Sequence, residues 1–455
     1  MINTSRRDFL AMLGITGGII AAPVGFCAAV APERRLRFGV LSDIHLQFEH
    51  SFGEYWKLER ALAWFKDQDV DAVVIAGDIA ENGLITEFET FAKMWYGFFP
   101  EDGRHGRKKV ERVFIFGNHD SGIVWRIPKM FPNDEEGKKK AILKYNQPAV
   151  WKRCFGEEFT PWYVKDVKGY KFLCSHWRTE GADADGFPEL PEYLKTHAEE
   201  IGKTKPFFVV KHSHPLGTCH CEERQHGNDS GKDTTSVLKA FPNAVCFSGH
   251  SHNSLTDERA CWQREFTSIG TASLCYSTSS CGHRITHHAM APKNHPYAIS
   301  GGDIHHGMIV DVHDGFLTVR RREFRYGLPL GEDWIVPCPV TPDSAMIIDK
   351  RRGAKRPPAY KTQPKVEVKD GVVTFAAVPQ GDKAFTRVYG YEVTATNKDS
   401  AVKPVVMSVR TAAADMPLET EPDIIMFCVK ANTFKNPADW TFKVVPFDSF
   451  GTPAA

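Results

Sequence analysis

The sequence lacks a marked excess of charge of either sign. Its 57 Lys and Arg residues are balanced by 56 Asp and Glu residues, so the formal net charge at pH 7 is +1. A protein that mainly binds nucleic acid usually carries a strongly basic surface, and we therefore expect no nucleic acid as main partner. Beyond residue 31 the sequence also lacks an internal repeat and any apolar run long enough to cross a membrane. No stable membrane span is expected once the N-terminal segment is removed.

A complete zinc-binding cysteine pattern is also missing, although the chain has 11 cysteines. Cys219-His220-Cys221 looks like half of such a pattern, but no second half follows at a standard spacing. A loop or a disulfide partner is the preferred interpretation. The spacings do not determine which cysteines would pair.

The N-terminus carries a pattern typical of export. Ser5-Arg6-Arg7-Asp8-Phe9-Leu10 precedes a weakly apolar run over 11–31 that contains several glycines and Pro23. This pattern predicts a twin-arginine signal peptide over 1–31, which is a receptor-read address. A membrane anchor or an amphipathic first helix is the alternative. The short, glycine-containing run favours removal after export, to the periplasm or the medium.

A chain of 455 residues exceeds the size at which one hydrophobic core stops growing. We therefore expect a large domain over 32–348 and a smaller one behind it. Apolar runs predict strands and amphipathic runs predict helices in strict alternation: 36–42, 57–68, 71–76, 84–99 and 112–116. This alternation is typical of an α/β layered core with right-handed crossovers.

Residues 121–205 interrupt the alternation. Helices are predicted over 134–145 and 191–201, and a strand pair over 162–165 and 170–175. We interpret the loops as an insertion that caps a crevice, or alternatively as an extension of the scaffold, and expect the strand pair to join the sheet.

Alternation resumes after this insertion. A strand, a helix and a second strand are predicted over 207–211, 234–241 and 244–248. Antiparallel strands of a second sheet are expected over 265–269, 307–312 and 316–324. Residues 277–302 are predicted to form a long loop.

The C-terminal part has a different composition. Residues 349–365 are rich in Lys, Arg and Pro, which predicts a linker. Short alternating runs follow at 366–369, 372–377, 390–396, 405–409, 424–429 and 440–446. Short strands at regular spacing, separated by turn residues, predict a β-sandwich domain over 366–455.

Polar side chains with metal-ligand chemistry follow directly after a series of predicted strands. The motifs are Asp43-Ile44-His45, Gly77-Asp78, Gly117-Asn118-His119-Asp120, His212-Ser213-His214 and Gly249-His250-Ser251-His252. In open α/β sheets the ligand crevice lies beyond such carboxyl ends. Each motif alone is a weak signal, but their order and placement together are specific.

These motifs resemble the blocks of the calcineurin-like metallophosphoesterases over roughly residues 36–337. The tail 331–337 resembles an exported bacterial branch that has a C-terminal β-domain. The resemblance implies a four-layer α/β/β/α sandwich with a C-terminal β-sandwich domain. It also implies two divalent metal ions of Mn, Fe or Zn, with Asp78 as the bridging ligand. By the same resemblance, one metal is completed by Asp43, His45 and His252, and the other by Asn118, His212 and His250.

The resemblance further implies attack on phosphorus by a metal-bridging hydroxide. His119 would orient the phosphate or protonate the leaving oxygen, and Asp120 would hold the His119 ring in one tautomer. The ligand before Pro215 is either His212 or His214, and His212 is preferred because it directly ends its strand. His176 and His306 are weaker candidates for contact with substrate.

The expected function is that of an exported, metal-dependent phosphoester hydrolase acting on small phosphomonoesters or phosphodiesters. Purple acid phosphatases carry a Tyr three residues after the bridging Asp, where this chain has Glu81, so the purple ferric version is not expected. The alternative is a non-catalytic binding protein of the same fold at the cell envelope, which would lack ligands of the set. A binding role centred on the β-sandwich is a further alternative, but that segment has no clear line of exposed aromatic residues.

Overall fold

The computed structural model describes residues 32–47, 55–101, 108–178, 186–219, 230–278, 285–296, 303–381 and 384–455. The predicted signal peptide, residues 1–31, lies outside these ranges, and so do His220 and Cys221 of the half zinc pattern.

The first sheet has seven strands. Its parallel part consists of β1 (Leu36–Leu41), β2 (Ala72–Ala76) and β3 (Glu111–Ile115). Its antiparallel part consists of β11 (His306–His313), β12 (Phe316–Glu323), β13 (Leu328–Pro329) and β14 (Trp334–Pro337). The prediction that 307–312 and 316–324 complete the second sheet is therefore wrong. Strand β11 is buried on both faces, so its side-chain pattern is compatible with either sheet, and only its pairing with β1 decides.

The second sheet has six strands in the order β4-β5-β6-β7-β9-β8. Their bounds are β4 (Trp162–Val167), β5 (Tyr170–Ser175), β6 (Phe207–Val210), β7 (Ala244–Ser248), β8 (Cys261–Gln263) and β9 (Thr267–Gly270). The strand pair β4–β5 joins the sheet, as predicted. Strand β9 runs parallel to β7, so the antiparallel orientation expected for 265–269 holds only against β8.

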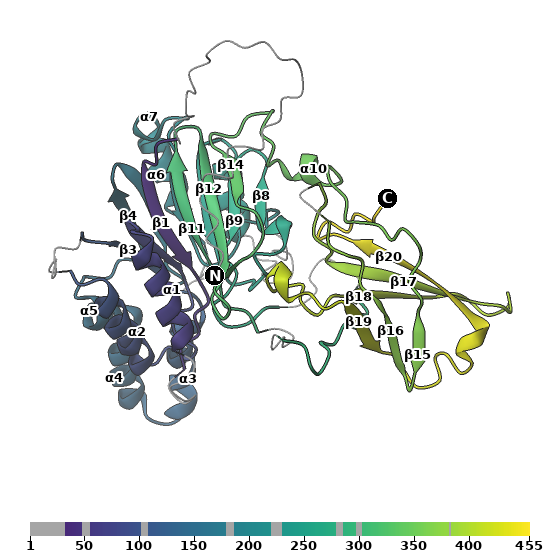
Figure 1. Ribbon diagram of the computed structural model, residues 1–455. Helices are drawn as coiled ribbons and strands as arrows, with labels where there is room; N and C mark the ends of the chain where they lie inside the picture. Colours follow the sequence, from purple (N-terminus) through teal and green to yellow (C-terminus); the bar gives the residue numbers. More distant parts are fainter. Residues whose placement is uncertain are drawn as a thin grey trace, which may run out of the picture. The chain divides into compact units, whose positions relative to one another are not determined.

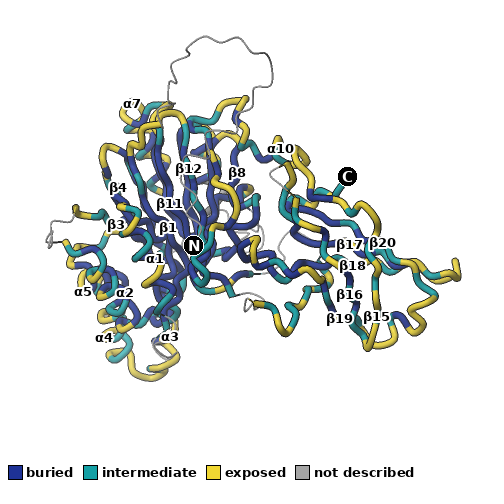
Figure 2. Tube along the Cα trace, in the orientation of Figure 1, coloured by how far each residue is buried: buried dark blue, intermediate teal, exposed yellow. Residues whose placement is uncertain are grey.

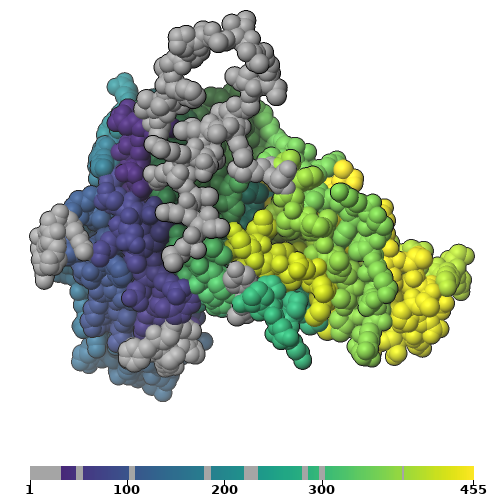
Figure 3. All heavy atoms as spheres, in the orientation of Figure 1, coloured from purple at the N-terminus to yellow at the C-terminus, as the bar shows by residue number. Residues whose placement is uncertain are grey.

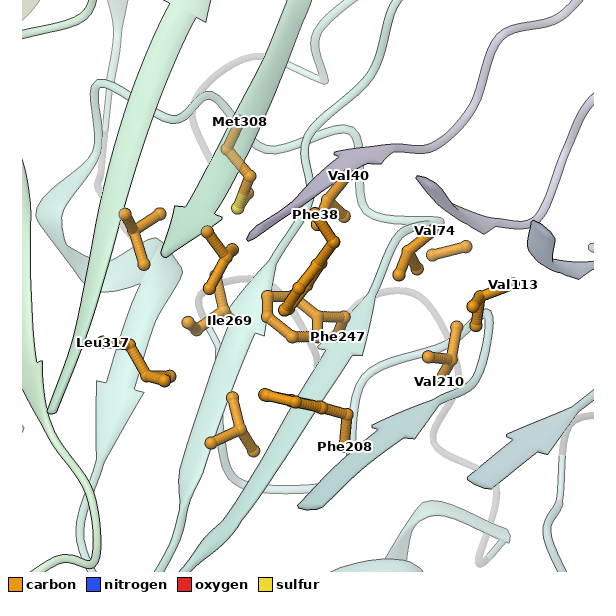
Figure 4. Close-up of a cluster of buried hydrophobic side chains, with 14 of the residues drawn as sticks. Phe38, Val40, Val74, Val113, Phe208, Val210, Phe247, Ile269, Met308 and Leu317 are labelled. Atoms are coloured by element: carbon orange, nitrogen blue, oxygen red, sulfur yellow. The ribbon is translucent and has the colours of Figure 1, made fainter. Parts of the chain in front are cut away.

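A hydrophobic core fills the space between the two sheets (Figure 4). Phe38 of the first sheet meets Phe172, Phe208 and Phe247 of the second edge-on, with ring centroids 5.2, 5.0 and 5.6 Å away. Edge-to-face contacts of this kind add about 0.5–1.5 kcal/mol each to the burial of the rings. The two sheets are thereby held face to face.

Helices cover the outer face of each sheet. On the first sheet, α1 (Trp56–Asp67), α2 (Ile85–Phe98) and α5 (Gln147–Phe155) share a core with the strands, and this layer forms the purple and blue surface of Figure 3. On the second sheet, α6 (Leu190–Thr196) and α9 (Ser230–Leu238) do the same. The order helix, sheet, sheet, helix confirms the four-layer sandwich (Figure 1). Figure 2 shows the strands as its most continuously buried elements.

The insertion over 121–205 contributes mainly to these layers. Besides β4, β5, α5 and α6 it contains α3 (Gly122–Met130), α4 (Glu135–Tyr145) and α7 (Ala198–Ile201), so the single helix predicted over 191–201 is divided in two. Helix α5 packs on α2. Whether the insertion also caps a substrate stays a prediction.

The C-terminal strands form two small sheets around a common core that includes Tyr391 and Phe427. The strands are β15 (Glu367–Lys369), β16 (Val372–Ala376), β17 (Gly390–Asn397), β18 (Val405–Arg410), β19 (Ile424–Cys428) and β20 (Trp440–Phe447). One further strand, β10 (His287–His288), comes from the predicted loop 277–302 and pairs with β18. A strand of two residues carries no periodicity, so the sequence offered no signal for it.

The stretch predicted as a linker begins as a short helix, α10 (Ile348–Arg351), whose Arg351 binds the carbonyl oxygen of Cys261.

Within the described ranges, no helix combines the length and the apolar character needed to cross a membrane. The described cysteines are all free thiols, most of them buried.

Candidate metal centre

The strand ends singled out in the sequence converge on one edge of the sandwich. Asp43, Asp78 and Asn118 follow β1, β2 and β3 of the first sheet, while His212 and His250 follow β6 and β7 of the second. Because the strands of each set are parallel, their carboxyl ends lie on the same side. The two sheets thus contribute opposite walls of one crevice.

The first group of ligand atoms comes from Asp43, His45, Asp78 and His252, all buried and within 4.8 Å of one another. His252 Nε2 lies 2.9 Å from Asp43 Oδ1 and 3.2 Å from His45 Nε2. His45 Nε2 lies 3.7 Å from Asp78 Oδ2.

The second group comes from Asp78, His212 and His250. His212 Nε2 lies 3.2 Å from Asp78 Oδ2 and 3.1 Å from Asn118 Oδ1. The ring centroids of His212 and His250 are 4.8 Å apart. Asp78 belongs to both groups, as a bridging carboxylate must.

The outer hydrogen bonds of the histidines show which ring nitrogen is offered to the centre. His45 Nδ1 is 2.6 Å from Glu81 Oε2, His212 Nδ1 is 2.8 Å from the carbonyl oxygen of Ala76, and His252 Nδ1 is 3.1 Å from that of Tyr276. Oxygen acceptors require the proton on Nδ1. Each Nε2 therefore turns a lone pair toward the centre, which is the arrangement that orients metal-binding histidines.

These residues fit divalent cations. The facing Nε2 atoms of His45 and His252 are both acceptors, and so are Asn118 Oδ1 and His212 Nε2, so a cation satisfies each pair. Asp78 is buried, and its Oδ2 lies 3.2 Å from His212 Nε2 and 3.7 Å from His45 Nε2, so a cation held there would interact with all three atoms. Imidazole, carboxylate and amide ligands suit Mn, Fe or Zn.

The backbone is strained where the ligands sit. Asp43, His45, Asp78, His250 and His252 all have φ between 49° and 65°, a region that costs a non-glycine residue about 1–2 kcal/mol. Such outliers persist only when the surroundings impose them, and they cluster at functional sites.

Glycines of the motifs allow the strand ends to approach each other. A Cβ on Gly117 would lie 2.2 Å from Asp78 Oδ1, and one on Gly249 would lie 2.3 Å from Asp43 Oδ2. Neither contact is tolerable, so the Gly-Asn-His and Gly-His motifs need glycine for close packing against a carboxylate.

The electrostatics of the crevice favour positive charge. Burial opposes ionisation of Asp78, but His212 holds the pKa of this carboxyl below its usual value. Burial would likewise lower the pKa of His212, yet Asp78 and Asp43 raise it to about 10. The carboxylates thus attract a cation, whether a proton or a metal ion.

His119 lies beside the first ligand group, with its ring centroid 4.7 Å from that of His45 and 34% of its side chain exposed. Its Nδ1 donates to the carbonyl oxygen of Glu81 at 3.0 Å and lies 3.5 Å from Glu81 Oε2. Because Nδ1 is engaged there, Nε2 is the atom available to a substrate.

The role predicted for Asp120 is wrong. Its two oxygens accept the backbone N–H groups of Ala80 at 2.8 Å and Gly117 at 2.7 Å, so the carboxyl ties the loops after β2 and β3 together. Burial and the nearby Asp78 raise the pKa of Asp120 well above its usual value. Glu81, which the sequence marked only as a departure from purple acid phosphatases, holds the His119 ring instead.

The partners of His212 and His214 favour His212 as the candidate ligand. Both ring nitrogens of His214 bond serine hydroxyls, those of Ser248 at 2.6 Å and Ser251 at 2.7 Å. His214 is therefore structural, and His212 lies in the metal group.

His176 and His306 lie away from the crevice. His176 accepts the N–H of Phe116 at 3.0 Å, and burial lowers its pKa to about 3. His306 accepts the N–H of Leu255 at 3.3 Å, and it is fully buried. Contact of either residue with substrate is not supported.

Two aromatic residues beside the ligands were missed. The Tyr276 ring lies 4.2 Å from that of His252, and the Trp177 ring lies 5.6 Å from that of His250. Burial, with Glu81 and Asp43 nearby, raises the pKa of Tyr276 to about 12, so its hydroxyl stays neutral. Neither residue belongs to a motif, and only proximity reveals them.

A four-layer sandwich that converges Asp, His and Asn side chains on one edge defines this part of the protein as a metallophosphoesterase-type domain. The family described as calcineurin-like phosphoesterase matches residues 36–254, the stretch that carries the ligand motifs. No curated protein sequence matches the chain significantly.

Solved structures to which the chain is similar include a dimetal phosphatase from Danio rerio, with 12% identity over 67% of this chain and 100% of that chain, at a TM-score of 0.40. A purple acid phosphatase from yellow lupin (Lupinus luteus) shares 13% identity over 66% of this chain and 53% of that chain, at a TM-score of 0.39. Wild-type Vps29 from Entamoeba histolytica, complexed with Zn²⁺, shares 10% identity over 66% and 99%, at a TM-score of 0.31.

Proposed function

We propose that the protein is a metal-dependent phosphoester hydrolase. The observation that carries the proposal is Asp78, a buried carboxylate that two groups of histidine and acid ligands share. The proposal is supported by the side chains that gather around Asp78, namely Asp43, His45, His252, His212 and His250, with Asn118 Oδ1 3.1 Å from His212 Nε2. A non-catalytic binding protein of the same fold would need no complete set.

The residues of the site would have different roles, according to where their side chains lie. Asp43, His45, Asp78 and His252 would hold one cation, and Asp78, Asn118, His212 and His250 the other. Cations held there would supply Lewis-acid chemistry by activating water and neutralising charge on the phosphate. His119 presents Nε2 to a phosphate oxygen or to the leaving oxygen, and Glu81 fixes the ring that does so.

Asp78→Asn tests this proposal. The amide keeps the size of the carboxylate but removes the bridging charge, so the variant should lose at least one metal ion and hydrolyse phosphoesters at least about 100-fold more slowly. Elemental analysis and a chromogenic phosphoester measure the two effects. Asp71→Asn is the matched control, because Asp71 is a buried acid at the opposite end of β2 that binds Arg37 and Lys108. Two metals and normal turnover in Asp78→Asn would overturn the proposal.

We further propose that the protein is exported by the twin-arginine route. The support is the Arg6-Arg7 pair and the apolar run that follows it. Export of folded protein would suit a site assembled from strand ends distant in sequence, because it needs the complete fold before it binds metal.

A further inference from the structure

Aromatic rings flank the candidate metal centre on both sides. Tyr276 lies beside the first ligand group, with its ring centroid 4.2 Å from His252 and 5.4 Å from His45. Trp177 lies beside the second group, with its ring 5.6 Å from His250 and 5.9 Å from His212. A phosphate held at the centre therefore has an aromatic side chain next to each half of its binding site.

Tyr276 is more accessible than the ligands it touches, and Trp177 keeps part of its surface exposed. Tyr276 is 41% exposed and Trp177 is partly exposed, whereas His45 and His212 are buried. Burial of a large aromatic side chain is favourable, so a ring that is left exposed beside a polar metal centre, as that of Tyr276 is, calls for an explanation. Covering by a bound group would supply the missing burial.

The backbone of each residue is held rigidly to the elements that carry the ligands. Trp177 donates its N–H to the carbonyl oxygen of Phe116, at 2.9 Å, just before the Gly117–Asp120 motif. The carbonyl oxygen of Tyr276 accepts a hydrogen bond from His252 Nδ1, and the backbone N–H of Tyr276 donates to Ser273 Oγ at 3.2 Å. Ser273 Oγ in turn donates to the carbonyl oxygen of Asp43 at 3.0 Å. The backbone positions that carry the two rings are therefore fixed with respect to the centre, which lowers the entropy cost of binding.

We propose that Tyr276 and Trp177 form a subsite for a flat ring attached to the phosphate, so that the preferred substrates are aryl or nucleoside phosphate esters. This rests on the proposed hydrolase function. A planar aromatic or heteroaromatic group offers a π-face to either ring, which an aliphatic ester group does not. The hydroxyl of Tyr276, for which no hydrogen bond to a described residue is found, can also bond polar atoms on the rim of a nucleobase.

The expected effect follows from the strength of stacking. Removing an aromatic residue that stacks on a base typically costs about 5- to 100-fold in binding. The loss should fall on KM for substrates that carry a ring, because stacking is made equally in the ground state and the transition state. Substrates without a ring should be unaffected.

Benzyl phosphate and ethyl phosphate form a matched pair, since their leaving alcohols are of similar acidity and only one has a ring. We expect the metal-loaded enzyme to prefer benzyl phosphate at least about 10-fold in kcat/KM. Tyr276→Leu and Trp177→Leu should each lower kcat/KM for benzyl phosphate at least about 5-fold, mainly through KM, and leave ethyl phosphate within about twofold. Tyr276→Phe should keep the benzyl preference. A uridine 5′-phosphate arm distinguishes the source of the ring, because a nucleoside subsite favours it over benzyl phosphate and an aryl subsite does not.

Phe385→Leu is the control, because it removes a ring that is 45% exposed in the C-terminal part of the chain. Metal content is measured for each variant, because both rings touch ligands. Equal losses on the benzyl and ethyl esters at full metal content, or no benzyl preference in the unmodified enzyme, would overturn the subsite.

Binding of benzylphosphonate and ethylphosphonate, which cannot be hydrolysed, separates this inference from the proposed function. If no ester is hydrolysed but benzylphosphonate binds at least about 5-fold more tightly, the hydrolase proposal fails and the flat-ring subsite stands. If neither phosphonate shows preference, the subsite is refuted whatever the turnover.

Discussion

Gly117→Ala should disable the metal centre by adding a single methyl group. The Cβ of the alanine would lie 2.2 Å from Asp78 Oδ1, 2.6 Å from the backbone nitrogen of Asp78 and 2.7 Å from His212 Cε1. An ordinary contact needs 3.4 Å or more. The carboxylate of Asp78 or the loop after β3 must therefore move by about 1 Å.

The size of the effect follows from that displacement. A shift of about 1 Å in a catalytic group can cost about 100-fold in rate, and Asp78 serves both ligand groups. We expect kcat/KM to fall at least about 100-fold and the metal content to fall below that of the unmodified protein. Overpacking of a buried site should also lower the free energy of unfolding by about 1–3 kcal/mol.

The assay compares Gly117→Ala with Gly97→Ala. Gly97 lies in helix α2 and a Cβ there meets nothing within 4 Å, so its replacement should leave activity unchanged and raise the free energy of unfolding by about 0.5–1 kcal/mol. Elemental analysis, steady-state kinetics and urea denaturation are run on both variants. Full metal content and normal kcat/KM in Gly117→Ala would refute the close-approach reasoning.

Further predictions concern the role of His119 in catalysis, the pH dependence of folding stability and the export of the protein. His119→Asn should keep its metals and lose about 10²–10⁴-fold in turnover on alkyl phosphates, and less on nitrophenyl phosphate if His119 is the acid; loss of metal would instead make it a ligand. Burial lowers the pKa of His176 in the folded protein to about 3, whereas a histidine of the unfolded chain has a pKa of about 6.5. Neutral His176 therefore contributes its full stability above pH 6.5, and this contribution is lost as the pH falls from about 6.5 toward 3. Urea denaturation from pH 7.5 to 5 should therefore show a shallower decline for His176→Gln, by up to about 1.4 kcal/mol per pH unit; equal slopes would contradict it. Lys-Lys in place of Arg6-Arg7 should leave the protein in the cytoplasm on cell fractionation, and normal export would refute the twin-arginine proposal.

The sequence alone determined the positions of most strands and the chemistry at their ends. An apolar run such as Ala72–Ala76 that stops on Gly77-Asp78 is a local signal, because a strand buried on both faces needs continuous hydrophobic residues. The short alternating runs of the C-terminal domain are equally local. The order of the ligand motifs along the chain resembled that of the calcineurin-like metallophosphoesterases, and this resemblance implied the four-layer sandwich.

The tertiary structure alone decided which atoms meet. Asp120 follows His119 directly, yet its side chain binds the N–H groups of Ala80 and Gly117 while Glu81 holds the His119 ring. His214 is two residues from His212 but bonds two serines. Strand β11 joins the first sheet by pairing with β1 far back along the chain. These outcomes depend on contacts between residues distant in sequence, and no local pattern of apolar and polar residues encodes them; the same holds for Tyr276 and Trp177, which only the fold brings beside the candidate metal centre.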